Sequence, residues 1–187
     1  PLKYVIVAER TMETTLQPFV QWKEKSGYNV IEAYTDVIGT TNTAITAYLQ
    51  GLYDAATPSD PAPLYVLIIG DHGDIAAHNG QTAGHITDLY FACYDGGSDY
   101  LPDLYYGRIS AATTTELQNA LDKILPYEQY TIPDGTYLDN AMLIAGTDAT
   151  FAPSHGDGTI LYGINEYFNT SHDLTNIYTL TLPVHTM

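Results

Sequence analysis

The sequence predicts an α/β fold in which helices cover both faces of a mostly parallel sheet. Three observations lead to this prediction. Short apolar runs alternate with amphipathic segments along the 187 residues. The runs are apolar throughout instead of alternating with polar residues, which is typical of parallel strands buried on both faces. Hydrophobic residues make up 45% of the chain, which is enough for a sizeable core and argues against disorder.

Five apolar runs are expected to form strands. They cover residues 4–8, 29–34, 64–69, 141–145 and 176–182. The third run ends at Gly70-Asp71, and the fourth ends at Gly146-Thr147-Asp148. Residues 87–94, which contain an apolar and aromatic run at 89–94, are also expected to form a strand.

Four helices are expected between these strands. The first covers 12–26 and ends at Gly27. The second has apolar residues at i, i+3, i+4 and i+7, namely Ile45, Tyr48, Leu49 and Leu52. The third begins with a capping box, Thr113-x-x-Glu116, followed by an apolar stripe. The last carries a similar stripe over 160–168.

One long segment interrupts the alternation of strands and helices. Residues 70–108 are rich in Gly and Asp and follow the carboxyl end of an expected strand. Ligand sites in open α/β sheets lie outside that end of the strands. Functional residues are therefore expected in this segment.

The charge balance is strongly acidic. Six basic side chains oppose twenty-two acidic ones, which gives a formal net charge of −16. Nucleic acid and anionic membranes both require a cationic face, so neither is an expected partner. No stretch reaches the roughly 20 apolar residues of a membrane span, so membrane insertion is not expected either.

Four aspartates of the 70–108 segment form a candidate metal site. Asp71, Asp95, Asp99 and Asp103 provide oxygen ligands, and small residues separate Asp95 from Asp99 as in loops that fold around Ca²⁺. The twelve-residue EF-hand loop is absent. A structural Ca²⁺ site and a solvated acidic turn both fit this spacing. A bound ion would stabilise a segment that the single Cys of the chain cannot stabilise through an internal disulfide.

Histidines and the cysteine of the same segment suggest other chemistry. His72, His78 and His85 invite a zinc interpretation, but their spacing matches no standard zinc motif, and surface loop histidines are the simpler interpretation. Cys93 is a candidate nucleophile with histidines available as bases. It lies in an apolar and aromatic run, where a thiol is usually buried and inert, and we favour that interpretation.

Further candidates lie near the end of the chain. Asp148 follows the expected strand at 141–145, where an active-site acid, a helix cap and a loop acid all fit. Thr159 or Asp157 is expected to cap the last helix at its N-terminus. The sequence contains no P-loop, no G-x-G-x-x-G after a strand and no G-x-S-x-G elbow.

Ordered blocks of residues resemble the gingipain family of cysteine peptidases (family C25, clan CD). They include LQPFVQWK at 16–23, GYNV at 27–30, YVLIIGD at 65–71, TDLY at 87–90, DYLPDLY at 99–105 and GR at 107–108. Residues 39–42, 143–146 and the position of Asp148 look closest to the lysine-specific member. The similarity extends from about residue 4 to about residue 178, which is nearly the whole chain.

This resemblance implies a caspase-like three-layer fold made of two subdomains, with residues 1–187 as the N-terminal one. The catalytic His and nucleophilic Cys of the family lie on the C-terminal subdomain, which would be the partner of this chain and is absent from it. The implied function is that of a secreted cysteine endopeptidase, extracellular or at the cell surface, acting on protein or peptide substrates. A basic P1 residue is expected, Lys rather than Arg. Residues 1–187 alone are expected to be inactive.

The resemblance also implies roles for individual residues. Asp148 matches the acid that orients the catalytic His, and Phe151 matches an aromatic wall of the S1 pocket. Thr159 stands where arginine-specific members have an S1 carboxylate. A structural Ca²⁺ site of the family matches Asp71, Asp95, Asp99, the carbonyl of Leu101, and Asp103. Between Asp95 and Asp99 this chain has two more residues than the gingipain pattern.

Two other functions are consistent with the sequence. One is a non-catalytic gingipain-like domain of a secretion or cell-surface protein, in which the His and Cys would not occur after residue 187. The other is an acidic calcium-binding adhesion or interaction module, in which Asp148 would be dispensable.

Overall fold

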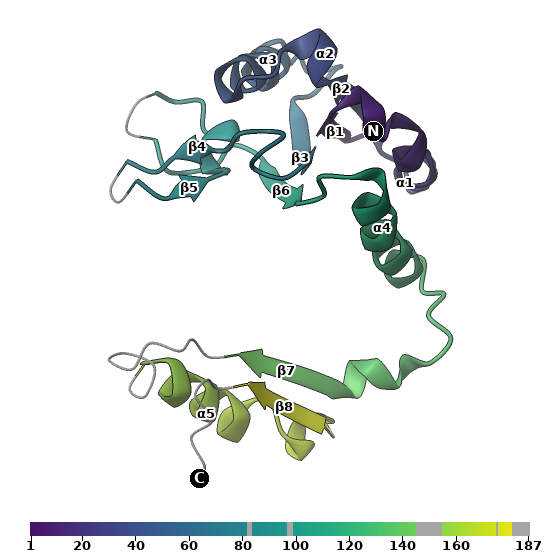
Figure 1. Ribbon diagram of the computed structural model, residues 1–187, viewed down its shortest axis with the longest axis vertical. Coiled ribbons are helices and arrows are strands. Elements are labelled where there is room, and N and C mark those ends of the chain that lie inside the picture. Colours follow the sequence, from purple (N-terminus) through teal and green to yellow (C-terminus); the bar gives the residue numbers. More distant parts are fainter. Residues whose placement is uncertain (82–83, 97–98, 145–154, 175, 181–187) are drawn as a thin grey trace. The chain divides into compact units, whose positions relative to one another are not determined.

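The computed structural model describes residues 1–81, 84–96, 99–144, 155–174 and 176–180, the last of these as backbone. The chain divides into two compact units, Pro1–Tyr130 and Thr131–Met187. Each unit has a parallel sheet of its own (Figure 1).

A four-stranded parallel sheet forms the centre of the first unit. Its strands are β1 (Lys3–Ala8), β2 (Asn29–Tyr34), β3 (Pro63–Ile69) and β6 (Tyr105–Ile109), in the order β2-β1-β3-β6. All three neighbouring pairs are parallel, so the predicted mostly parallel sheet is confirmed. The first three strands agree with the expected ones within one residue. The sequence did not predict β6, in which Gly107 and Arg108 interrupt the apolar run.

Helices cover both faces of this sheet, as predicted (Figure 1). α1 (Glu13–Lys25) and α4 (Thr114–Glu128) pack on one face, and α3 (Asn42–Asp54) packs on the other with the short 3-10 helix η2 (Leu89–Phe91). Successive side chains of a strand point to opposite faces. Val5 and Val7 of β1 therefore join the core on the α3 side, whereas Ile6 and Ala8 join the core on the α1 and α4 side.

The helix boundaries follow the local signals in the sequence. The capping box of α4 is present: Glu116 N–H donates to Thr113 Oγ1 at 3.2 Å, and Thr113 N–H donates to Glu116 Oε2 at 3.2 Å. Gly27 follows α1 with a φ of +96°, a backbone conformation that favours glycine at helix ends. The predicted stripe of the second helix also packs inward, with Ile45 and Leu49 fully buried.

Short elements complete the first unit. They are the 3-10 helix η1 (Arg10–Met12), α2 (Thr35–Ile38), β4 (His78–Asn79) and β5 (Ile86–Thr87), the last two forming an antiparallel hairpin. The expected strand over 87–94 is wrong, because β5 ends at Thr87 and residues Leu89–Phe91 turn as η2. This turn places Phe91 in the core, where it is fully buried.

Among its described residues, the second unit contains one parallel pair of strands. It comprises the 3-10 helix η3 (Gly135–Asp139), β7 (Asn140–Ile144), α5 (Asp157–Glu166), the 3-10 helix η5 (Thr170–His172) and β8 (Asn176–Leu180). Met142 and Ile144 of β7 are 69% and 64% exposed, so one side of this strand is uncovered within the described residues. In the described part of the chain, no helix combines the length and the apolar character needed to cross a membrane.

Candidate functional site

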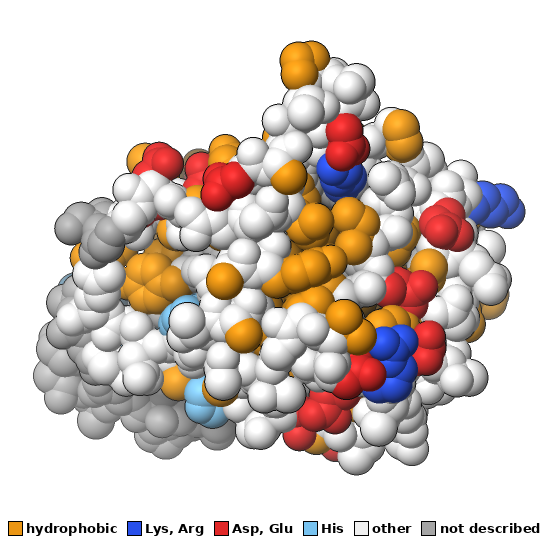
Figure 2. All heavy atoms as spheres, turned by 90° about the horizontal axis from the view of Figure 1, so that it is seen from above, with side chains coloured by type: hydrophobic (Ala, Val, Ile, Leu, Met, Phe, Trp, Pro, Cys, Tyr) orange, Lys and Arg blue, Asp and Glu red, His pale blue; other side chains and the backbone are white. Residues whose placement is uncertain are grey.

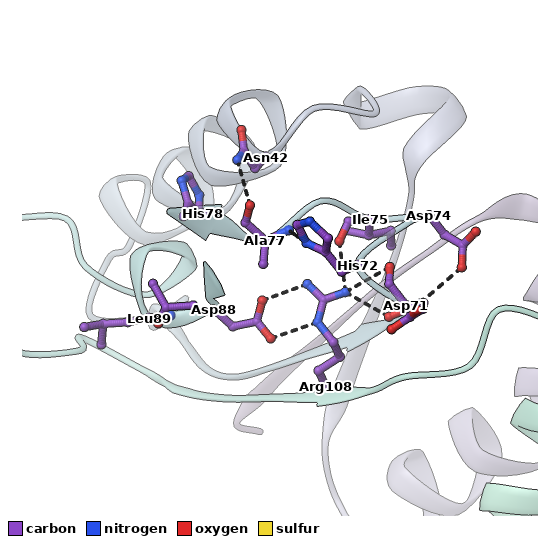
Figure 3. A network of polar contacts seen from close by, with 12 residues as sticks. Asn42, Asp71, His72, Asp74, Ile75, Ala77, His78, Asp88, Leu89 and Arg108 are labelled. Atoms are coloured by element: carbon purple, nitrogen blue, oxygen red, sulfur yellow. Dashed lines mark hydrogen bonds and ion pairs between the residues drawn. The ribbon is translucent and has the colours of Figure 1, made fainter. Parts of the chain in front are cut away.

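Arg108 lies on β6, and its side chain is directed toward the loops at the carboxyl end of the sheet (Figure 3). Its Nε and Nη2 donate to the two carboxylate oxygens of Asp88 at 2.8 and 2.7 Å. The two side chains are only 11% and 19% exposed. Two parallel, charge-assisted hydrogen bonds make this a strong and geometrically specific form of ion pair.

The remaining nitrogen of Arg108 holds the turn that follows β3. Nη1 donates to the carbonyl oxygens of Gly70 and Ile75 at 2.8 and 3.0 Å, and to that of Asp71 at 3.4 Å (Figure 3). Gly70 has a φ of +147°, and an added Cβ would lie 3.2 Å from Ile75 Cγ1, so the turn requires glycine. One guanidinium thus joins β6, the end of β3 and the segment that leads into η2.

Two histidines anchor the chain beyond this turn. His72 Nδ1 accepts a hydrogen bond from the Ala77 N–H at 3.1 Å. His78 Nε2 lies 2.9 Å from Thr46 Oγ1 on α3, and its ring packs against Phe91 with a centroid distance of 4.7 Å. Burial lowers the pKa of His78 below its ordinary value, which favours the neutral ring in this apolar contact.

These contacts decide between the two interpretations of the histidines. His72 and His85 are exposed, as expected for loop histidines, whereas His78 is half-buried and packs into the core, so the surface interpretation is wrong for His78. Among the residues that the structure describes, no group of three or more His, Cys, Asp or Glu side chains is placed to hold a metal ion. The geometry gives the zinc interpretation no support.

The acidic residues of the loop before β6 are engaged with the loop's own backbone. Asp99 accepts hydrogen bonds from the Leu101 N–H at 2.9 Å and the Asp95 N–H at 3.2 Å. Asp103 accepts from the Tyr94 N–H at 2.9 Å, and its own N–H donates to the Ala92 carbonyl at 2.7 Å. Each carboxylate therefore orders its own stretch of the loop.

The described arrangement does not by itself form a calcium cage. Asp71 is exposed at the end of β3, where its N–H donates to Asp74 at 3.2 Å, and within the described part of the chain no hydrogen bond or ion pair joins it to Asp95, Asp99 or Asp103. Oxygen ligands are the type that Ca²⁺ prefers, and this loop offers several. The calcium site at Asp71, Asp95, Asp99, Leu101 and Asp103 stays a prediction.

Cys93 has the properties of a structural thiol. Its side chain is partly buried, and burial, followed by the charges of Asp99 and Asp103, raises its pKa to about 11. A nucleophilic cysteine needs the opposite shift, because the thiolate is the reactive form. The geometry thus favours the inert interpretation of Cys93.

The predicted site residues of the second unit are only partly described. Asp148 and Phe151 lie outside the described residues. Thr159 lies in the first turns of α5, and its hydroxyl donates to the His155 carbonyl. The expected cap by Thr159 or Asp157 is wrong: the N-cap of α5 is Gly156, without a side-chain hydrogen bond. Hydroxyls that bond four residues back in this way are not available as caps.

A protein-family model matches almost the entire chain. The model described as Peptidase family C25 matches residues 1–185. The chain belongs to peptidase family C25. This confirms the family that the ordered blocks of residues resemble.

Curated C25 proteins from Porphyromonas gingivalis are similar to this chain. Lys-gingipain is 37% identical over 180 residues, which cover 95% of this chain and 10% of that protein. Gingipain R2 is 24% identical over 160 residues, which cover 84% of this chain and 21% of that protein. The chain thus spans between a tenth and about a fifth of these two C25 relatives.

Solved structures of proteases share the fold. The one named "Structure of Protease" has a TM-score of 0.85 at 36% identity, covering 96% of this chain and 40% of that chain. The arginine-specific cysteine proteinase gingipain R has a TM-score of 0.77 at 24% identity, covering 99% of this chain and 42% of that chain. The predicted fold class is confirmed by these matches.

Sequence reasoning did not identify the Arg108–Asp88 pair of this C25 chain. The two residues appeared only inside blocks of family resemblance. One signal was present, because Arg108 is the only basic residue between Lys25 and Lys123. A lone cation beside apolar strand residues requires a buried carboxylate partner.

Replacing Arg108 by Ala is expected to destabilise the first unit by about 3–5 kcal/mol, because it leaves the Asp88 carboxylate buried without its partner. The measurement is urea unfolding followed by the fluorescence of Trp22, the only tryptophan, whose Nε1 donates to Glu128 within the same unit. Arg10→Ala is the matched control. It breaks an exposed pair with Asp36 and is expected to cost about 1 kcal/mol. An equal loss of unfolding free energy in both variants would contradict the role of Arg108.

Cys93 is expected to react slowly with iodoacetamide in the folded protein. With a pKa of about 11, only about 0.1% of the thiol is ionised at pH 8. The alkylation rate should rise steadily as the pH approaches 11, because each added unit of pH below the pKa increases the thiolate fraction about tenfold. The same chain in denaturant is the reference, and equal rates in both states at pH 8 would refute the structural assignment.

Proposed function

We propose that this chain is part of a secreted, calcium-stabilised cysteine endopeptidase of family C25, with the catalytic His and Cys supplied by the remainder of the protein. The match of residues 1–185 to the family model carries this proposal. The raised pKa of Cys93 supports it, because the one thiol of this chain is unsuited to act as the nucleophile. On this proposal residues 1–187 alone are inactive.

The role proposed for this chain is to orient and support the catalytic groups. A Cys–His peptidase requires an acid that fixes the imidazole tautomer and stabilises the imidazolium. Asp148 is the residue proposed for this task, four positions after the end of β7. Phe151 would line the S1 pocket, where an aromatic ring can pack against the aliphatic stem of a P1 side chain.

The proposed specificity is for a basic P1 residue, Lys rather than Arg. Identity is 37% with Lys-gingipain and 24% with gingipain R2. Thr159, at the position where arginine-specific members have a carboxylate, offers no charge to pair with a guanidinium. The net charge of −16 would attract cationic protein or peptide substrates in general.

The proposed partner of this chain is the C-terminal subdomain of the same protein. A parallel sheet is normally covered on both faces. In the second unit Met142 and Ile144 leave one side of β7 exposed, which is the kind of surface that a further layer of the same domain would bury.

Changing Asp148 to Asn in the full-length protein is expected to lower kcat on lysyl peptides by on the order of 10³–10⁴-fold, because the amide favours the wrong tautomer of the histidine. Folding should be nearly unaffected. Asp173→Asn is the control, since Asp173 is an exposed residue with a φ of +62°, a conformation that Asn adopts readily. An unchanged kcat in Asp148→Asn would favour a non-catalytic domain or an adhesion module instead.

Calcium is expected to raise the melting temperature of this chain after treatment with a chelator. Three carboxylates of the loop act on nearby groups: Asp103, burial and Asp95 raise the pKa of Tyr53 on α3, and burial, Asp99 and Asp103 raise the pKa of Cys93. An ion bound only by the folded state stabilises it by about 2.7 kcal/mol at a hundredfold excess over Kd. Asp103→Asn should reduce the shift, whereas Asp122→Asn on α4 should retain it. The absence of any shift in the unmodified chain would refute the calcium proposal.

A further inference from the structure

All six basic side chains of this protein lie in helices or strands. The first two lie at the starts of β1 and η1, two lie in the last turn of α1, and the others lie in β6 and α4: Lys3, Arg10, Lys23, Lys25, Arg108 and Lys123. The loops that join these elements contain no Lys or Arg. They include residues 55–62, 70–77, 92–104 and 129–134.

Four of the six cations are also held by carboxylates. The pairs and their N–O distances are Lys3–Asp60 at 2.8 Å, Arg10–Asp36 at 3.2 Å, Lys23–Glu128 at 2.8 Å and Arg108–Asp88 at 2.7 Å. The few basic side chains visible on the face shown in Figure 2 lie beside acidic ones. A side chain in such a pair must lose its partner before it can enter another negatively charged or polar pocket.

Proteolysis depends on the local structure around the scissile bond. Exposed loop tips are the preferred sites of cleavage, and residues inside helices and strands become accessible only after local unfolding. A peptidase that recognises Lys or Arg at P1 therefore finds no loop target in residues 1–187. Each basic residue requires the opening of an element, and four of them also require the breaking of an ion pair.

We propose that the placement of Lys and Arg protects this chain from cleavage by the peptidase of which it is part. This inference rests on the proposed function, and it adds a constraint on the same active site. The substrates of that site are proteins with Lys in accessible loops, and residues 1–187 do not belong to that class. Solubility alone would not require this placement, because lysines in surface loops are compatible with a soluble protein.

The structure also identifies the weakest point of this protection. Lys25 is exposed and is the last residue of α1. The backbone after it is still hydrogen-bonded, with the Ser26 N–H donating to the Trp22 carbonyl and the Gly27 N–H to the Glu24 carbonyl, both at 2.9 Å. Helix ends fray more readily than helix centres, so the first self-cleavage should occur after Lys25.

The test introduces a lysine into a loop of the full-length protein. Ala56 is exposed in the loop between α3 and β3, and Ala56→Lys creates a Lys–Thr bond there. We expect cleavage after position 56 during incubation of the active protein, at a rate at least about tenfold above any cleavage of the unmodified protein. Fragment masses identify the bond. Asn119→Lys adds the same charge within α4 and should remain intact, and Ala56→Gln controls for the change of side chain at the loop position.

The outcomes separate this inference from the function on which it rests. A lysyl peptide is included as substrate in every incubation. If the protein cleaves the peptide but Ala56→Lys is as stable as Asn119→Lys, the inference is overturned and the proposed function stands. If the protein does not cleave the peptide, the proposed function fails, and with it the protection. Selective cleavage of Ala56→Lys supports both.

Discussion

The ion pair between Arg108 and Asp88 is the interaction on which the carboxyl edge of the four-stranded sheet depends. The segment between β3 and β6 is long and has little regular structure, so its backbone groups need partners outside a sheet or helix. Arg108 provides donors from within β6 to Asp88 and to the carbonyls of Gly70 and Ile75. The chain has one cysteine and no internal disulfide to cross-link this segment. A single guanidinium therefore connects elements that are distant in sequence, as a covalent cross-link would.

Weaker, uncharged contacts extend this order outward from the guanidinium. Asn42 Nδ2, at the start of α3, donates to the Ala77 carbonyl at 3.2 Å (Figure 3). His78 lies between Thr46 and Phe91. A neutral hydrogen bond contributes only about 1 kcal/mol, whereas removing one member of a buried ion pair costs several times as much. The outer part of the segment is thus expected to open before its base, which Arg108 holds.

The sequence predicted those parts of the fold that have local signals. The apolar runs gave β1, β2 and β3, and the capping box at Thr113 marked the start of α4. β6 was missed because Gly107 and Arg108 interrupt its apolar run and its partner β3 is distant in sequence. The β4–β5 hairpin was missed because each of its strands has only two residues, too few to show an apolar pattern. The partnership of Arg108 with Asp88 spans twenty residues and has no spacing rule that could reveal it. The cap of α5 was misassigned because a hydroxyl near a helix start can also bond backward, and the sequence does not distinguish the two geometries.

The net charge of −16 comes from a shortage of Lys and Arg, and the few that are present lie only in certain parts of the structure. A largely buried Lys or Arg requires a carboxylate, because an unpaired buried charge costs several kcal/mol. Stability alone thus explains why Lys3 and Arg108 are paired, and the favourable interaction of cations with a helix C-terminus explains Lys23 and Lys25. Neither argument explains why the loops lack Lys and Arg, since loop lysines are solvated and cost little. Folding therefore does not require the absence of Lys and Arg from the loops. A peptidase that recognises lysine gives this absence a consequence, because a loop without lysine offers it no bond to cleave.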